Sequence, residues 1–137
     1  MTRVQDRGTI TAMIAVLAVF FFAMALMVGE GGRKLGNISR AQDVASEAAR
    51  AAAATLDIDS LASGSPRIDT NADRAKAQAD LIITAAGAEV ELVDFRVNLS
   101  ATNVFVEVRV EGVSVFPGFD ISGTGSHTAQ VIDPSLE

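Results

Sequence analysis

The chain has 137 residues, no cysteine and a net charge of −6, which is enough polypeptide for one modest domain. The absence of cysteine excludes disulfides, thiolate zinc sites and a cysteine nucleophile. The 11 lysines and arginines are scattered along the sequence, whereas nucleic-acid binding usually needs a clustered basic face, so we expect no nucleic-acid partner.

The first predicted element is a run of 21 uncharged residues, 9–29. As a helix it extends roughly 31 Å, the thickness of the hydrocarbon core of a bilayer. A secretory signal has a shorter apolar region, of about 7–15 residues, and a cleavage site between small residues. A buried core helix would need the rest of the chain to surround an apolar cylinder. We therefore predict a transmembrane helix in contact with membrane lipid.

Basic residues flank the predicted span on both sides. Arg3 and Arg7 precede it, and further basic residues follow at positions 33, 34 and 40. The positive-inside rule therefore does not fix the orientation. Because residues 1–8 are few and otherwise featureless, we expect them to be a cytoplasmic leader-like segment, with the chain beyond the span on the outer side of a single-pass membrane protein.

The stretch GEGGRKLG, at positions 29–36, contains four glycines. Each glycine costs about 1 kcal/mol relative to alanine inside a helix, so we expect a hinge or a frayed turn where the chain leaves the bilayer. Close contact with another helix through Gly32 and Gly36, which have i, i+4 spacing, is the alternative.

Residues 30–56 form the next predicted helix, which is rich in alanine. Asn37 or Ser39 would cap it if it began as a separate helix. Small apolar residues recur every three or four positions, which is the spacing of one helix face. This packing face allows very close approach to another helix or to a sheet, and it consists of Ala41, Val44, Ala45, Ala48 and Ala52.

Residues 57–69 are predicted to be a linker, since Asp, Ser, Gly and Pro predominate and Pro66 ends any helix there. The remainder, 70–137, is predicted to be a C-terminal α+β domain. Its helix begins at Thr70 with a T-x-x-D capping pattern and ends at Gly87. The expected buried face of this helix contains Ala75, Ala79, Ile82 and Ile83.

The last fifty residues have a period of two, which predicts strands with one polar face. VDFRVNL has apolar residues at 93, 95, 97 and 99, and VFVEVRVEGVSVF has valines at 104, 106, 108 and 110. SATN between them fits a hairpin turn, and FPGFD fits another. Gly112 shifts the phase, so we expect a bulge that keeps Val113 and Val115 on the apolar side.

A third, weaker and glycine-rich strand is predicted in ISGTGSHTAQVI. The expected fold class is therefore α+β. A long N-terminal transmembrane helix continues into the alanine-rich helix, and a second helix and an antiparallel sheet of three or more strands follow. At least one helix covers the valine face of the sheet.

Residues suited to catalysis or metal binding are few. His127 is the only histidine, and a general base also needs a positioned nucleophile. Asp57 and Asp59 lack the later ligands of an EF-hand calcium loop. GEGG and GTGS do not fit a phosphate-binding loop. We therefore expect no enzyme activity, no metal and no cofactor.

Several short motifs follow one another in a set order near the start of the chain. The order is Arg7-Gly8, Thr9-Ile10-Thr11, the apolar helix, the exit motif Glu30-Gly31-Gly32-Arg33, and the alanine-rich segment 41–53. Over about the first 57 residues this order resembles the N-terminal segment of TadE/TadG-like proteins of the tight-adherence (Tad/Flp) pilus system. The resemblance implies a pilin-like protein, either a minor pilin or a pseudopilin. Such a protein contacts other pilins and pilus assembly proteins through its N-terminal helix.

The resemblance also implies a cut by prepilin peptidase between Gly8 and Thr9. Prepilins usually carry Glu five residues past the cut, where it offsets the new terminal amine in apolar surroundings. The matching residue here is Met13. Either the chain is not processed, or it is processed without joining a filament core in the usual way. The alternative function is a membrane-anchored exported binding module whose function lies in the sheet domain.

Overall fold

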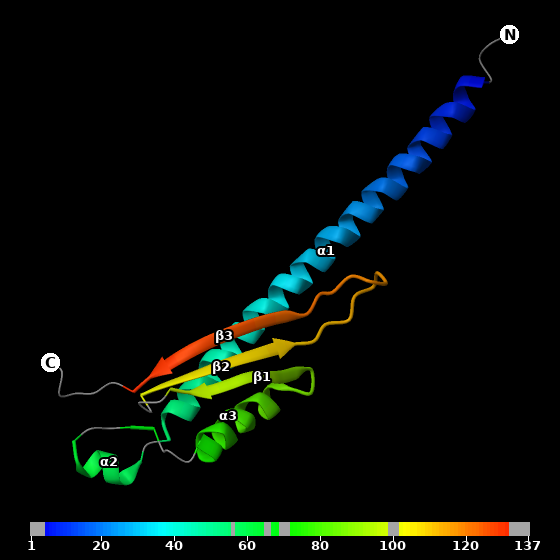
Figure 1. Cartoon of the computed structure of the whole chain (residues 1–137). Coiled ribbons are helices and arrows are strands. Elements are labelled where there is room, and N and C mark those ends of the chain that lie inside the picture. Colours follow the sequence, from blue (N-terminus) through cyan, green and yellow to red (C-terminus); the bar gives the residue numbers. More distant parts are fainter. Residues whose placement is uncertain (1–4, 56, 65–66, 69–71, 99–101, 132–137) are drawn as a thin grey trace.

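The computed structural model describes residues 5–55, 57–64, 67–68, 72–98 and 102–131. A long helix projects as a rod from a small packed region (Figure 1). We call this packed region, which comprises α1 from Asn37 onward and everything after it, the head domain. The elements in chain order are α1 (Gln5–Ala53), α2 (Ile58–Ala62), α3 (Ala72–Ala86), β1 (Val90–Val97), β2 (Asn103–Val110) and β3 (Gly123–Gln130).

The predicted α+β fold is confirmed: an apolar N-terminal helix leads into further helices and an antiparallel sheet. Within the described residues the sheet has three strands in the order β1-β2-β3, and both neighbouring pairs are antiparallel. β2 lies in the middle and supplies the core with the four predicted inward valines. Each of them is at most 1% exposed: Val104, Val106, Val108 and Val110.

Helix α1 is unbroken over 49 residues, so the predicted hinge is absent, as is a separate helix start at Asn37. Nothing lies within 4 Å of the positions where side chains would begin at Gly29, Gly31, Gly32 and Gly36. Helix propagation is cooperative, and packing on the sheet holds the second half of α1 in place. The cost of about 1 kcal/mol per glycine is therefore not enough to interrupt the helix.

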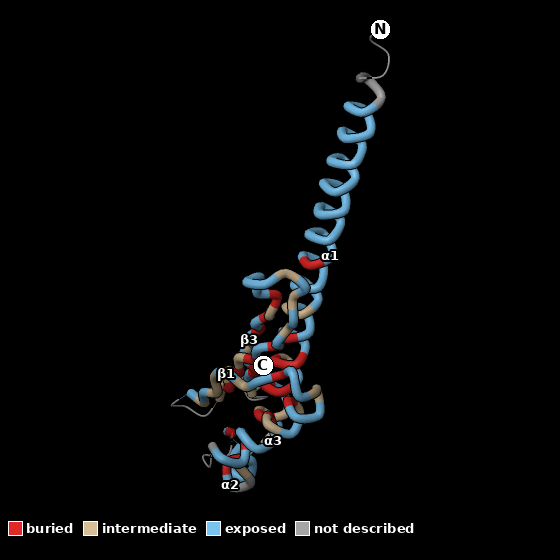
Figure 2. The backbone as a smooth tube through the Cα atoms, turned by 90° about the vertical axis from the view of Figure 1, so that its right-hand side faces the viewer, coloured by how far each residue is buried: buried red, intermediate tan, exposed pale blue. Residues whose placement is uncertain are grey.

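Helices α1 and α3 cover the valine face of the sheet, with α1 on β2 and β3 and α3 on β1. Most buried residues lie in this contact and a few lie beside α2, whereas the first half of α1 is exposed from residue 8 onward (Figure 2). Helix α3 ends at Gly87, which has a φ of 127°. Its predicted buried face is confirmed for three residues, with Ile82 only half-buried: Ala75, Ala79 and Ile83.

Helix α1 and β3 approach each other so closely that side chains do not fit between them. A Cβ at Gly123 would lie 2.3 Å from the backbone nitrogen of Ile38, and one at Gly125 would lie 2.3 Å from that of Gln42. The glycines that make β3 look weak as a strand therefore allow its backbone to rest on the helix backbone.

Strand β1 differs from its predicted alternation because it contains a bulge. The register with β2 shifts between Leu92 and Asp94, so the intervening Val93 is the extra residue and 52% of it is exposed. The prediction that Val93 faces the core is therefore wrong. Beyond the bulge, Phe95 and Val97 pack against the core as predicted. Leu99 and the first two residues of the SATN turn lie outside the described residues.

The bulge predicted at Gly112 does not form, because β2 ends at Val110. Val113 and Val115, which were expected on the apolar side of the sheet, are instead 89% and 68% exposed. The residues between β2 and β3, 111–122, form a long connection that we call the β2–β3 loop. Its FPGFD portion turns as predicted, with Gly118 at a φ of 84°.

The described part of the segment predicted to be a linker contains a short helix and contributes to the core. Asp57 caps the short helix α2, since its side chain accepts a hydrogen bond from Asp59 N. The backbone N–H of Asp57 donates to Arg67 O over 3.0 Å, which folds the segment back on itself. This brings Ile68 into the core with none of its surface exposed. Pro66 and the predicted helix start at Thr70 lie outside the described residues.

Candidate functional site

The first half of α1 is an apolar rod whose side chains from residue 8 to residue 29 are exposed. In the described part of the chain, α1 is the one helix long and apolar enough to cross a membrane, and its most apolar stretch is entirely unburied. Phe20, Phe21 and Phe22 are 58%, 65% and 69% exposed. Burying one such side chain gains about 1.5–3 kcal/mol. This surface is therefore compatible with a transmembrane helix.

The residues implied in processing lie near the beginning of this rod. Gly8, Thr9 and Met13 are all on α1 and exposed, with Met13 at 65%. Their positions within a regular helix neither require nor prevent cleavage, so the cut between Gly8 and Thr9 stays a prediction.

The predicted packing face of α1 is already occupied within the chain. The five residues named from the sequence are at most 9% exposed, and Ala49 joins them in the same core. They pack against the sheet and α3. The chain's own strands and α3 therefore cover this alanine stripe, and small residues allow this close approach to a sheet. The apolar rod remains open to partners.

The exit motif contains one buried carboxyl group. Glu30 is only 4% exposed, and its Oε1 accepts a hydrogen bond of 2.9 Å from the backbone N–H of Val115 in the β2–β3 loop. Arg33 Nη1 lies 3.7 Å from the same oxygen. The other oxygen, Oε2, is buried without a hydrogen-bond partner among the described residues. Glu30 therefore fastens the loop at the point where the apolar run ends.

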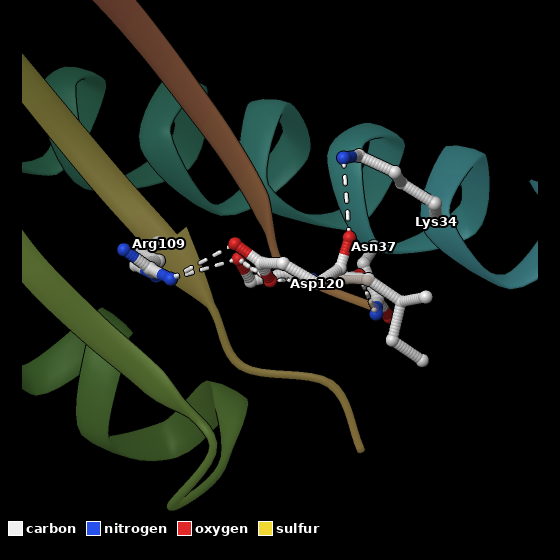
Figure 3. A network of polar contacts seen from close by, with 6 residues as sticks. Lys34, Asn37, Arg109 and Asp120 are labelled. Carbon is white, nitrogen blue, oxygen red and sulfur yellow. Dashed lines mark hydrogen bonds and ion pairs between the residues drawn. The ribbon is translucent and has the colours of Figure 1, made fainter. Parts of the chain in front are cut away.

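Two further side chains of α1 hold the returning arm of the loop. Lys34 Nζ donates to the backbone carbonyl of Asp120 over 3.2 Å, and Asn37 Nδ2 donates to that of Ile121 over 2.8 Å. Figure 3 shows both contacts, together with Arg109 reaching the Asp120 carboxylate from the sheet. Glu30, Lys34 and Asn37 have i, i+4, i+7 spacing, so they share one face of α1.

Asp120 has a pKa below its ordinary value. The main cause is the hydrogen bond that its carboxylate accepts from the Ser122 hydroxyl, followed by the bond from the Ser122 backbone N–H. Arg109 and Lys34 lower it further. The folded state thus binds this proton less readily than the unfolded state. The resulting stabilisation is present at neutral pH and is lost as the pH falls through the lowered pKa.

A pH prediction follows for the loop. Protection of the Ser122 amide against hydrogen exchange, corrected for the intrinsic rate, should be constant between about pH 8 and pH 5 and should fall only in stronger acid. Asp120→Asn should remove this acid-dependent loss, because an amide can accept the same bonds without titrating. A loss of protection already near neutral pH would contradict the assignment to Asp120.

An apolar pocket of about 250 Å³ opens on the N-terminal side of the Glu30 contact. Ala23 lies seven residues before Glu30, which places it roughly 10 Å closer to the N-terminus along the helix axis. The two phenylalanines of the loop therefore extend beside the apolar run. The pocket is lined by Ala23, Met27, Glu30, Phe116 and Phe119.

His127 and Asp57, which were considered for catalysis and for metal binding, lie in a strand and at the start of a helix. His127 is half-buried on β3, opposite Val106 of β2. Asp57 is the cap of α2. Within the ranges that the structure describes, no group of three or more His, Cys, Asp or Glu residues could hold a metal ion.

Comparison of the chain with protein-family models, with curated proteins and with solved structures gave no match.

Sequence reasoning singled out Glu30 as part of the exit motif but missed its partner in the loop. A signal was present, because residues 112–119 are uncharged and mostly apolar and lie between Glu111 and Asp120. A period-two interpretation assigned part of this stretch to a strand. The structure shows that this stretch is a loop, because β2 ends at Val110.

Removing the Glu30 carboxyl group should release the loop. In Glu30→Ala, the Val115 amide should exchange roughly ten- to hundredfold faster, because a hydrogen bond to a charged group typically contributes about 1.5–3 kcal/mol. Glu30→Gln keeps an acceptor oxygen and should lose less protection. Glu47→Ala removes an exposed carboxyl group from the same helix and serves as the control. Equal exchange rates in Glu30→Ala and Glu47→Ala would contradict a loop fastened by Glu30.

Proposed function

We propose that this chain is a non-enzymatic structural or assembly component of a Tad-type pilus, in the manner of a minor pilin or pseudopilin. The observation that carries the proposal is the division of α1. One half is an exposed apolar rod, and the other half is built into an α+β head domain. The ordered motifs of the first 57 residues support the same assignment.

The division of α1 suits a protein that is first held in a membrane and then packed into an assembly. An apolar helix with a bilayer's length is stable in lipid. The same surface is available for packing against apolar helices of other pilins or pilus assembly proteins. In this proposal the head domain lies on the extracytoplasmic side of the cell membrane. The rod is the surface for partners, since the alanine stripe is occupied.

Replacing residues 1–28 by an unrelated single-pass anchor tests the proposal. This exchange keeps Glu30, Lys34 and Asn37, and with them the hydrogen bonds that hold the loop. Pilus formation or secretion should be lost although the chimera inserts and its head domain folds, because the packing surface has changed. Retained function would favour the alternative, a membrane-anchored binding module that acts through the sheet domain.

Protease added to intact protoplasts should digest the head domain, and full protection would contradict the proposed topology.

Intact mass of the membrane-extracted protein tests processing. A mass lower by residues 1–8 would establish the cut between Gly8 and Thr9. An unchanged mass in cells with an active prepilin peptidase would instead support a membrane-resident assembly factor, consistent with Met13 standing where prepilins usually have Glu.

A further inference from the structure

The tip of the β2–β3 loop, residues 112–119, is rich in apolar side chains. The rest of the head domain leaves several of them exposed. Residues 112–119 carry no charge. Val113, Val115 and Phe119 are 89%, 68% and 48% exposed. Single exposed apolar side chains are ordinary on a protein surface, but several of them together on one loop indicate contact with another apolar phase.

The tip lies at the level of the apolar run of α1. Phe116 and Phe119 line one pocket together with Ala23 and Met27, which belong to the uncharged stretch 9–29. Figure 1 shows the loop extending from the ends of β2 and β3 toward the N-terminal half of α1. If that stretch is surrounded by lipid, the tip reaches the outer part of the same lipid layer.

Three backbone N–H groups of the tip are paired within the chain. The N–H of Val115 donates to Glu30 Oε1 over 2.9 Å, and that of Phe116 donates to Ser114 Oγ over 3.0 Å. The N–H of Phe119 donates to Phe116 O over 3.2 Å, and Pro117 has no N–H. Because unpaired backbone donors are costly in lipid, this local pairing lowers the free energy cost of entering the bilayer edge.

Basic side chains lie on the turn of α1 that follows Glu30, on the head-domain side of the loop tip. The Arg33 side chain is 59% exposed, and Lys34 holds the returning arm of the loop through Asp120. Arg and Lys at this level keep their charges among headgroups while their stems cover apolar surface. The order along α1 is therefore apolar rod, apolar loop tip, then cations, which is the polarity profile of a membrane surface.

We propose that the tip of the β2–β3 loop is a second lipid contact, which inserts into the outer edge of the bilayer beside α1 and fixes the orientation of the head domain. This inference rests on the proposed span, and it commits to membrane lipid as the occupant of the exposed tip. Glu30 is the residue that positions the loop for insertion.

The chain has no cysteine, so single cysteines carrying a polarity-sensitive fluorophore can report depth in nanodiscs that hold one copy each. Val115→Cys labels the loop tip. Val93→Cys, at the exposed bulge of β1, is the matched control in the head domain, and Val19→Cys marks the span. All three positions are at least 52% exposed, so the label does not disturb the core. Quenching by lipids brominated either near the headgroup or near the end of the acyl chain is compared with quenching by aqueous iodide.

The label at Val115 should be quenched severalfold more strongly by the brominated lipids than the label at Val93, and less by iodide. If the lipids quench the label at Val19 but iodide quenches the labels at Val115 and Val93 equally, the loop insertion is overturned. The span is then the one lipid contact that remains. Shielding from both quenchers would also overturn it, since protein would then cover the tip. Failure of lipid quenching at Val19 as well would overturn the span together with the loop insertion.

Discussion

Gly125→Val should lower the free energy of unfolding of the head domain by about 3 kcal/mol, because it forces a side chain into a contact that has no room. A Cβ at this position would lie 2.3 Å from Gln42 N and 2.4 Å from Ala41 C. Both are backbone atoms of α1, so no change of rotamer relieves the clash. The helix must move away from β3 and weaken its contacts with the sheet.

Chemical denaturation of the full chain in detergent, followed by hydrogen exchange of the β2 and β3 amides, measures this effect. Ser126→Val places the same side chain on the exposed face of the same strand and should change stability little. Gly36→Ala fills open space in α1 and should stabilise the helix by up to about 1 kcal/mol. A midpoint for Gly125→Val equal to that for Ser126→Val would contradict the backbone contact between α1 and β3.

Ile68→Ala should destabilise the head domain by about 2–4 kcal/mol, the usual cost of leaving a cavity at a fully buried aliphatic side chain. Ile68 is 0% exposed although it lies in a segment with the composition of a linker. The bond from Asp57 N to Arg67 O holds the segment closed beside it. The packing of Ile68 thus ties the connection between α1 and α3 to the core.

Leu61→Ala is the matched control for Ile68→Ala. Leu61 belongs to the same segment but is 50% exposed on α2, so its loss should cost less than about 1 kcal/mol. The two variants are compared by their denaturation midpoints in the full chain. Equal losses would mean that the 57–68 segment does not contribute to the core.

Stability of the head domain and attachment of the loop are separable properties. The glycine contacts and Ile68 lie within the packed layers, whereas Glu30 and Lys34 hold only the β2–β3 loop. Glu30→Ala should therefore loosen the loop and the proposed membrane contact with little effect on unfolding of the sheet. Gly125→Val should act on the sheet first.

The sequence by itself determined the features that depend on local composition and period. The uncharged run 9–29 specifies an apolar helix, the alanine spacing from 41 to 52 specifies a packing face, and the alternating valines of β2 specify a strand with one buried side. These follow from the 3.6-residue and two-residue periods of regular structure and need no knowledge of the partner surface.

Only the tertiary structure decided what lies against each face. It covers the alanine stripe with β3, brings Ile68 into the core, makes Val93 a bulge residue and pairs Glu30 with Val115 across 85 positions. It also keeps α1 continuous through its glycines. Such outcomes depend on contacts between residues far apart in the chain, whose free energy outweighs local propensities of about 1 kcal/mol per residue.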